Sequence, residues 1–158
     1  MLMDRKEESV KALIQRVTRA SVSVAGEETG RIKQGLVVLV GVAEGDTEKD
    51  IRYLVDKTLG LRIFADEQEK LNLSIVDMKG ELLVISQFTL LADTRRGRRP
   101  SFTGAARPDE AAVLFERFVG EVRASGLRTE TGRFQQHMLV EIHNDGPVTL
   151  MLDSRDKF

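Results

Sequence analysis

Two long apolar runs restrict the folds that this chain can adopt. Residues 36–42 (LVVLVGV) and the first part of 82–90 (LLVISQFTL) place apolar side chains at consecutive positions rather than at every second position. This pattern is typical of strands that are buried on both faces near the centre of a sheet. We therefore predict a sheet whose central strands are covered on both sides.

Two segments show the spacing of apolar residues that is typical of a helix. The first has Asp46 as its N-cap, Gly60 at its end, and a stripe formed by Ile51, Leu54, Val55, Thr58 and Leu59. The second starts at Pro108, ends at Gly126, and has a stripe formed by Ala112, Phe115, Phe118, Val119 and Val122. Two helices are too few for a doubly wound sheet, so several neighbouring strands must be antiparallel.

The length of 158 residues and the 41% hydrophobic content fit one compact domain. We predict an α/β fold with a mixed, largely antiparallel, barrel-like curled sheet and helices packed on one side. Further elements are expected as strands at 12–18, 20–24 and 61–64, a glycine-bearing turn at 26–30 and a polar loop at 66–72. The domain would span 12–152, after a flexible extension at 1–11 and before a polar tail at 153–158.

Composition excludes several classes of protein. Cysteine is absent, so there is no disulfide framework, thiol nucleophile or cysteine-based zinc site. No apolar run approaches the ~20 residues of a membrane span, and the N-terminal segment lacks the apolar stretch of a secretory signal. The net charge of −1 argues against a general nucleic-acid coat, so any RNA contact must come from a local basic patch. These features fit a cytoplasmic protein.

The common catalytic signatures are also missing, including G-x-S-x-G, the P-loop, H-E-x-x-H and the Rossmann glycine pattern. The spacing of His137 and His143 is not one that favours a shared metal ion, so we predict surface or strand-face positions for both. Three other stretches remain as candidates for function.

Ser86, Gln87 and Thr89 place polar side chains at the end of an apolar strand, in the motif S-Q-F-T-L. Buried polar groups need partners, so these residues either line a site or bond to the neighbouring backbone. The second stretch, TRRGRRPSF at 94–102, carries four arginines around a glycine: Arg95, Arg96, Arg98 and Arg99. It is either an exposed loop that neutralises phosphates or a solvated surface loop.

The third stretch is N-D-G-P-V-T at 144–149, which interrupts two strand-like runs at 139–143 and 148–152. A tight turn needs only Asn-Gly or Asp-Gly. Here a proline follows the glycine, which removes a backbone donor and stiffens the chain. The motif is therefore suited to holding peptide carbonyls in fixed positions.

Together with ALIQRVTRASVSV near the start and TGRF at 131–134, these stretches resemble one family. The chain is similar, over about residues 12 to 152, to the D-aminoacyl-tRNA deacylases, which hydrolyse D-amino acids from mischarged tRNA. The motifs S-Q-F-T-L and N-D-G-P-V-T, at their separation, carry the resemblance. The extra N-terminal segment and the tail SRDKF depart from the family pattern. They leave two translation starts open, Met1 and Val10, the latter through a GTG codon.

The resemblance implies a homodimer in which a cis Gly146–Pro147 pair projects from one subunit into the active site of the other. The two carbonyl oxygens would receive the substrate's α-ammonium group and obstruct an L side chain, whereas a D side chain points away. Enantiomers share every functional group, so discrimination must come from position, which a stiff backbone fixes. Asn144 and Arg16 would hold this loop. Glycine has no side chain to obstruct, so glycyl-tRNA, such as glycine mischarged on tRNA(Ala), should also be hydrolysed.

The resemblance also places Ser86, Gln87, Phe88 and Thr89 on the pocket floor, with amides near Phe88 and Thr89 polarising the ester carbonyl. Phe134 and Met138 would line a pocket for the terminal adenosine, with ordinary core packing as an equal alternative. The implied partners are aminoacyl-tRNA and a second copy of the chain, without membrane, DNA, metal or organic cofactor.

Two routes to ester cleavage stay open. Thr89 is a possible nucleophile, but no base is evident near it in the sequence. The route we prefer uses the substrate's own ribose hydroxyl to activate water, since an aminoacyl ester is already reactive and needs mainly positioning. A non-catalytic homodimer that binds tRNA ends is the alternative function, and it explains the basic loop but not the Gly-Pro pair.

Overall fold

The structure is a computed structural model and describes residues 9–156. One six-stranded sheet forms its centre, built from β1 (Lys11–Val24), β2 (Glu27–Ile32), β3 (Gly35–Gly41), β6 (Glu81–Ser86), β7 (Thr129–Thr131) and β8 (Leu139–Asp153). A small second sheet contains β4 (Phe64–Ala65) and β5 (Leu71–Leu73). The helices are α1 (Glu48–Gly60), α2 (Ile75–Met78) and α3 (Pro108–Arg123), with short 3-10 helices η1 (Phe88–Leu91) and η2 (Ser154–Asp156).

Strand β1 organises the sheet. The order is β2-β1-β3-β6-β7, and β8 pairs with β1 along its other edge. The three neighbours of β1 are antiparallel to it, whereas the β3–β6 and β6–β7 pairs are parallel. One half of β1 pairs with β3 and the other half with β2, so the sheet curls around this long strand. The predicted mixed, curled, largely antiparallel sheet is confirmed.

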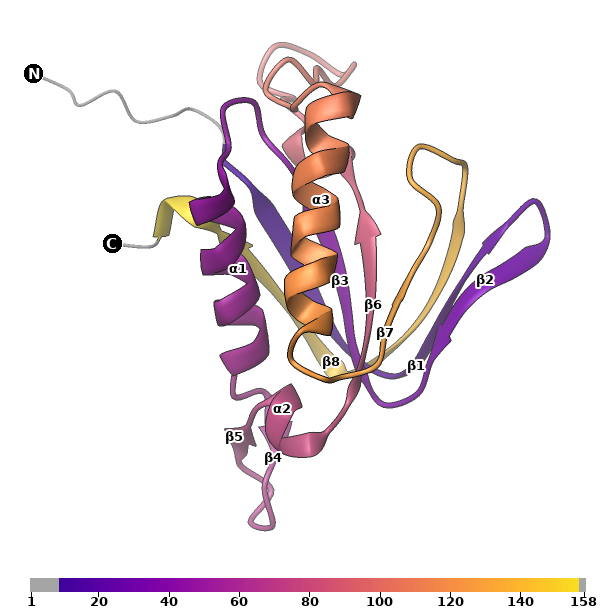
Figure 1. Ribbon diagram of the computed structural model, residues 1–158, viewed down its shortest axis with the longest axis vertical. Coiled ribbons are helices and arrows are strands. Elements are labelled where there is room, and N and C mark those ends of the chain that lie inside the picture. The colour runs from indigo at the N-terminus through magenta and orange to yellow at the C-terminus, as the bar shows by residue number, and fades with distance from the viewer. Residues whose placement is uncertain (1–8, 157–158) are drawn as a thin grey trace, which may run out of the picture.

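The helices lie on one side of this sheet, as predicted. Figure 1 shows α1 and α3 side by side on one face of this sheet. Leu36, Val38 and Val40 of β3 point to this face and are fully buried. They pack in one cluster with residues of both helices, among them Ile51, Leu54, Phe115, Phe118 and Val122.

A second apolar cluster fills the opposite face of the same strands. Val37 of β3 and Leu83 and Ile85 of β6 are buried there, together with Val17, Ala20, Val22 and Ile32. Met138, Val140 and Ile142 pack against this cluster from the β8 side. Burial on both faces explains the consecutive apolar positions in β3 and β6, and it confirms that these two are central strands.

The helix ends differ little from the expectation. The N-cap of α1 is Thr47, not Asp46, and Thr47 forms a capping box with Asp50. The Asp46 carboxylate instead accepts a hydrogen bond from the Ala43 amide at 2.6 Å. Helix α3 begins at Pro108 as predicted, and Gly126, with a φ of +87°, lies just after its end.

Several predicted boundaries need correction. The expected turn at 26–30 is mostly strand β2, because the reversal needs only Ala25 and Gly26. The runs 12–18 and 20–24 form one strand, and the run 82–90 leaves the sheet at Ser86. Helix α2 was not predicted, since its single turn is too short to show a period.

Both chain ends of the predicted domain also extend further than expected. Ser9 and Val10 are buried, so the ordered fold begins before residue 12, while residues 1–8 of the predicted extension lie outside the described residues. In the predicted tail, Asp153 ends β8, and Ser154 in η2 is buried. The Ser9 hydroxyl donates a hydrogen bond to the Asp153 carboxylate, which joins the two ends.

Candidate functional site

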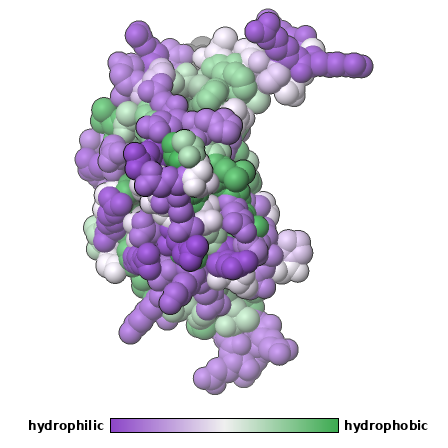
Figure 2. Space-filling model, turned by 90° about the vertical axis from the view of Figure 1, so that its right-hand side faces the viewer, coloured by the Kyte–Doolittle hydropathy of each residue, from purple (hydrophilic) through white to green (hydrophobic). Residues whose placement is uncertain are grey.

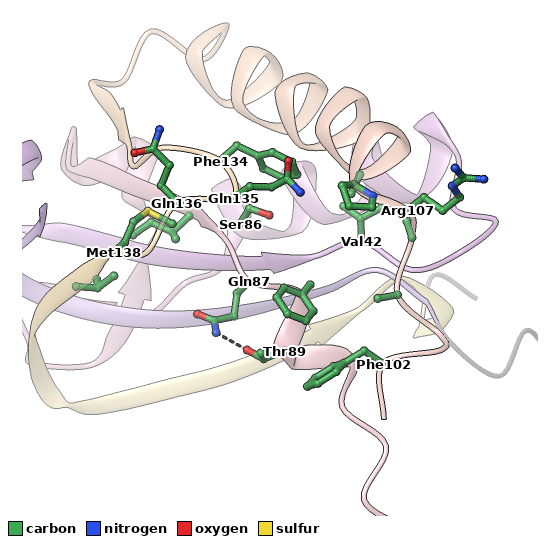
Figure 3. A pocket seen from close by; sticks show the side chains of 17 residues that line it. Val42, Ser86, Gln87, Thr89, Phe102, Arg107, Phe134, Gln135, Gln136 and Met138 are labelled. Carbon is green, nitrogen blue, oxygen red and sulfur yellow. Dashed lines mark hydrogen bonds between the residues drawn. The ribbon is translucent and has the colours of Figure 1, made fainter. Parts of the chain in front are cut away.

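A cavity of about 690 Å³ opens where β6 leaves the sheet. Its floor and walls come from the end of β6, from η1, from the loop before α3, and from the segment that precedes β8 (Figure 3). The structure brings six of the predicted residues together there: Ser86, Gln87, Phe88, Thr89, Phe134 and Met138.

The floor is shaped by the close approach of η1 to strand β3. The Gln87 amide donates to the Val40 carbonyl at 2.8 Å, after which the chain turns into η1. A Cβ at Gly41 would lie 3.0 Å from the Gln87 carbonyl oxygen and 3.1 Å from the Leu90 Cβ, so the glycine permits this approach. The first internal bond of η1 runs from Leu90 to Gln87. The preceding amides, of Phe88 and Thr89, therefore have no acceptor within the helix.

The floor side chains are connected to one another. The side-chain amide of Gln87 donates a hydrogen bond to the hydroxyl of Thr89 (Figure 3). Thr89 is exposed. Among the described residues that line the cavity, Arg107 is the only one with a charged side chain. A carboxamide cannot take a proton from Thr89, so the cavity itself supplies no general base for this hydroxyl.

Aromatic and sulfur side chains form the walls. Phe88 lies edge-to-face with Phe102, with ring centroids 5.0 Å apart, and 56% of Phe88 is exposed. Phe134 stacks on Phe115 of α3 at 6.1 Å and also lines the cavity. Phe134 therefore packs against the core and also forms part of the cavity wall. The Met138 sulfur accepts a hydrogen bond from the Arg133 backbone amide, with an N–S distance of 3.4 Å.

The N-D-G-P-V-T motif forms a bulge in β8 rather than a chain reversal. Gln15 of β1 pairs with Thr149, and Val17 pairs with Asn144. The four residues 145–148 therefore stand opposite Arg16 alone, while both flanking runs continue along β1. Gly146 and Pro147 are exposed, and the peptide bond between them is cis.

Arg16 and Asn144 contact this bulge directly. Arg16 donates to the Asp145 carbonyl at 3.0 Å and to the Ile63 carbonyl at 2.7 Å. The Asn144 side chain accepts from the Val148 amide at 2.8 Å and donates to the Thr149 hydroxyl at 2.9 Å. Gly146 has a φ of +132°, and a Cβ there would lie 3.0 Å from a guanidinium nitrogen of Arg16. A side chain at this position would disturb the bulge.

The structure does not bring the two motifs together within one chain. Gly146 and Pro147 are absent from the residues that line the cavity, whereas Val140 of the same strand is among them. The exposed bulge and the cavity are therefore separate features of a single copy.

The four arginines lie in an exposed loop between η1 and α3. A short bridge between Asp93 and Ser101 closes the loop, and Arg95 bonds to Asp93 at 2.8 Å. These hydrogen bonds from Arg95 hold the pKa of the Asp93 carboxyl well below its usual range. Phe102 at the end of the loop lines the cavity, so the basic loop adjoins the cavity mouth.

The sequence did not identify several other residues that line the cavity, among them Phe102, Arg107, Gln135 and Gln136. Phe102 ends the arginine-rich stretch, and its aromatic character was the available signal. Within residues 9–156, no group of three or more His, Asp and Glu side chains is placed to hold a metal ion. No helix in the same range is long and apolar enough to cross a membrane. Figure 2 shows a mainly hydrophilic surface on the side of the β1–β2 turn, with separate apolar patches.

Comparison with known proteins gives a consistent result. The family model for D-Tyr-tRNA(Tyr) deacylase matches residues 13–153. A D-aminoacyl-tRNA deacylase of Dehalococcoides mccartyi is 59% identical, covering 94% of this chain and 97% of that protein. A protein of the same name from Desulforamulus reducens is 60% identical, covering 94% of this chain and 100% of that protein.

Two solved structures share the fold. A c-Myc DNA unwinding element binding protein superposes with a TM-score of 0.86 at 40% identity, covering 90% of this chain and 97% of its own. A probable eukaryotic D-amino acid tRNA deacylase gives a TM-score of 0.80 at 19% identity, over 92% and 99% of the two chains, which supports the fold alone. The family match and the two bacterial relatives span nearly the whole chain. The chain therefore belongs to the D-Tyr-tRNA(Tyr) deacylase family and is a hydrolase of the aminoacyl-tRNA ester bond.

Proposed function

We propose that this protein removes D-amino acids from tRNA by hydrolysing the ester to the terminal adenosine, and that the reaction takes place on the Ser86–Thr89 floor. One observation carries this proposal: a cavity with a floor of backbone and amide groups and aromatic walls opens beside an exposed arginine loop. The aromatic walls suit a nucleoside, and the arginines suit the phosphates behind it. A protein that acts on aminoacyl-tRNA works where translation occurs, so we infer a cytoplasmic location.

The cavity is suited to positioning an ester more than to acid–base catalysis. The amides of Phe88 and Thr89 precede the first bond of η1 and are available to a developing oxyanion. With no base among the described lining residues, we infer that the ribose hydroxyl beside the ester helps to activate water. Thr89 would then position water or substrate instead of forming an acyl-enzyme.

Chiral selection is assigned to the bulge of a second copy of this chain. Gly146 and Pro147 are exposed and lie outside the cavity of their own chain. The residues on either side of them are held by hydrogen bonds, Asp145 by Arg16 and Val148 by Asn144. An exposed Gly-Pro pair with a fixed backbone is suited to enter a partner's cavity. There its two carbonyl oxygens would accept the α-ammonium group and occupy the space that an L side chain needs, while a D side chain points away.

Because this selection acts on shape, it predicts that one substrate without a D side chain is also hydrolysed. Glycine has no side chain to exclude, so glycyl-tRNA, including glycine mischarged on tRNA(Ala), should be hydrolysed together with D-aminoacyl-tRNAs. L-Ala-tRNA differs by one methyl group and should be spared. The identity of the D side chain should have little effect on the rate, because that group points away from the carbonyls.

A second candidate function is a nucleic-acid-binding dimer without catalysis. The exposed arginines favour it as much as they favour an enzyme, and one solved relative is named for binding a DNA unwinding element. This candidate gives no role to Gly146 and Pro147.

The deciding experiment is to incubate the purified protein with D-Tyr-tRNA, L-Tyr-tRNA, Gly-tRNA(Ala) and L-Ala-tRNA(Ala) and to follow release of the amino acid. We expect hydrolysis of the D-tyrosyl and glycyl substrates only. Tight tRNA binding without release of any amino acid would instead support the binding module. Sparing of Gly-tRNA would show that more than steric exclusion selects the substrate.

A further inference from the structure

Gln135 adopts a backbone conformation that favours glycine. It occupies the third position of a turn from Arg133 to Gln136, closed by a hydrogen bond from the Gln136 amide to the Arg133 carbonyl at 3.2 Å. The φ of Gln135 is +64°, whereas Phe134 before it is not in the positive region. A turn with positive φ at this position alone is of type II, where glycine or asparagine is the usual residue. A glutamine there is strained.

Among residues 9–156, the Gln135 side chain gains no hydrogen bond that would offset this strain. In the part of the chain that the structure describes, no protein group forms a hydrogen bond with the Gln135 carboxamide, and the residue is exposed. Three other non-glycine residues in this part have positive φ: Ala25, Glu69 and Lys79. They lie in the β1–β2 turn, in the loop before β5 and at the end of α2, and none of them lines the cavity. Gln135 is the member of this group that does.

The side chain is placed where a substrate would meet it. In Figure 3, Gln135 lies beside Phe134, on the side of the cavity that holds Ser86. Phe134 is fixed by stacking on Phe115 and offers its other side to the cavity. A base that stacks there would turn its edge toward a neighbouring polar group.

We propose that the Gln135 carboxamide hydrogen-bonds to the edge of the terminal adenine while the base lies against Phe134. A carboxamide offers one donor face and one acceptor atom, which complement the adenine N6 amino group and an adjacent ring nitrogen. A phosphate would be better served by the arginines nearby, so the neutral amide is better matched to a base edge. The proposal rests on the deacylase function above and makes Gln135 a specificity-determining residue of that site.

The first test is stability. Because glycine tolerates the φ of +64°, Gln135→Gly should raise the Tm by about 2 °C while deleting the amide. Glu69→Gly, at a φ of +62° and far from the cavity lining, is the matched control and should show a similar rise with unchanged kinetics. A fall in Tm for Gln135→Gly would show that the side chain supports the fold, which would overturn the proposal.

The second test is a double-mutant cycle between the protein and its substrate. D-Tyr-tRNA ending in adenosine is compared with D-Tyr-tRNA ending in purine riboside, which lacks the N6 amino group. The wild type should lose about tenfold in kcat/KM on the purine substrate, mainly through KM, whereas Gln135→Gly should treat both substrates alike. Equal losses for both proteins would mean that Gln135 does not contact the base edge.

Binding keeps this test separate from the deacylase proposal. The amide analogue 3′-(D-tyrosylamino)-3′-deoxyadenosine cannot be hydrolysed, so calorimetry with it and with its purine counterpart reports the base contact without chemistry. Weaker binding of the purine analogue to the wild type, but not to Gln135→Gly, would support the contact even if no ester were cleaved. Equal affinities in the wild type would overturn it even in an active enzyme.

Discussion

The floor at Ser86–Thr89 and the bulge at Asn144–Thr149 are opposite in shape and in surroundings. The floor is concave and is enclosed by segments from four parts of the chain. The bulge is convex and exposed, and it is held mainly by its own strand and by Arg16 of the strand beside it. At the floor, the amides of Phe88 and Thr89 have no acceptor within η1, and at the bulge the cis Gly146–Pro147 peptide is exposed.

Under the proposed function, this difference fits two halves of one site, with one half of each site carried by each chain. Donors at the floor suit the electrophilic carbonyl of an ester, and acceptors at the bulge suit an ammonium group. A single aminoacyl ester contains both groups on adjacent atoms. Since the bulge does not line its own cavity, we propose that the halves meet when two copies associate, and a symmetric dimer would form two such sites.

The largest expected effect concerns the floor. If the ribose hydroxyl activates water, D-Tyr-tRNA ending in 2′-deoxyadenosine should react about 100–1000-fold more slowly than the natural substrate. Thr89→Ala should keep its rate within about tenfold, because within the described part of the chain the Thr89 hydroxyl is bonded only to the Gln87 side-chain amide. Single-turnover rates with both substrates measure this, with Thr103→Ala in the exposed loop as control. An inactive Thr89→Ala that still binds tRNA, or a trapped acyl-threonine, would restore the covalent route.

The second prediction tests whether the two halves meet across a dimer. Gly146→Ala disturbs the bulge and Gln87→Ala the floor, and each homodimer should lose about 100-fold in kcat/KM on D-Tyr-tRNA. In an equal mixture allowed to exchange subunits, half of the dimers are mixed and each has one intact site. Activity should then return to about a quarter of the wild-type value. A mixture as inactive as its parents would place both halves in the same chain.

The sequence predicted the central strands better than the chain path around them. Apolar residues at consecutive positions identified β3 and β6, because burial on both faces leaves a direct mark on composition. The sequence of strand β2, EETGRI, is polar and carries a glycine, so it predicts a turn. Pairing with β1 stabilises this segment as a strand, although its own residues do not favour that conformation.

The bulge shows what sequence alone could not give. Glycine and proline at 146 and 147 indicated a stiff backbone, but not that both flanking runs continue along one neighbour. That result depends on the register with β1, a contact between residues far apart in the chain. Gln135 was missed for a related reason, since a positive φ at a glutamine leaves no trace in composition.

The third prediction concerns the loop that adjoins the floor but not the bulge. If Arg98 and Arg99 neutralise acceptor-stem phosphates, replacing both with alanine should weaken tRNA binding about tenfold near 0.1 M salt. The slope of log K against log salt should fall by about 1.5–2. Arg52→Ala with Arg117→Ala, on α1 and α3, is the control of equal charge. The preference for D over L substrates should not change. An unaltered salt slope would indicate that the loop is solvated and does not contact phosphates.

The smallest effect separates the support of the bulge from its contact with substrate. Arg16 joins two carbonyls, of Asp145 and Ile63, with a planar fork that lysine cannot reproduce. Arg16→Lys should therefore lower the Tm by about 2–4 °C, which corresponds to about 1 kcal/mol, and should allow slow hydrolysis of L-Ala-tRNA because the carbonyls are less firmly held. Arg19→Lys, exposed on the same strand, should change neither quantity. A loss of stability with L-Ala-tRNA still fully spared would mean that the bulge keeps its position through Asn144 and its own strand, and that Arg16 contributes to the fold alone.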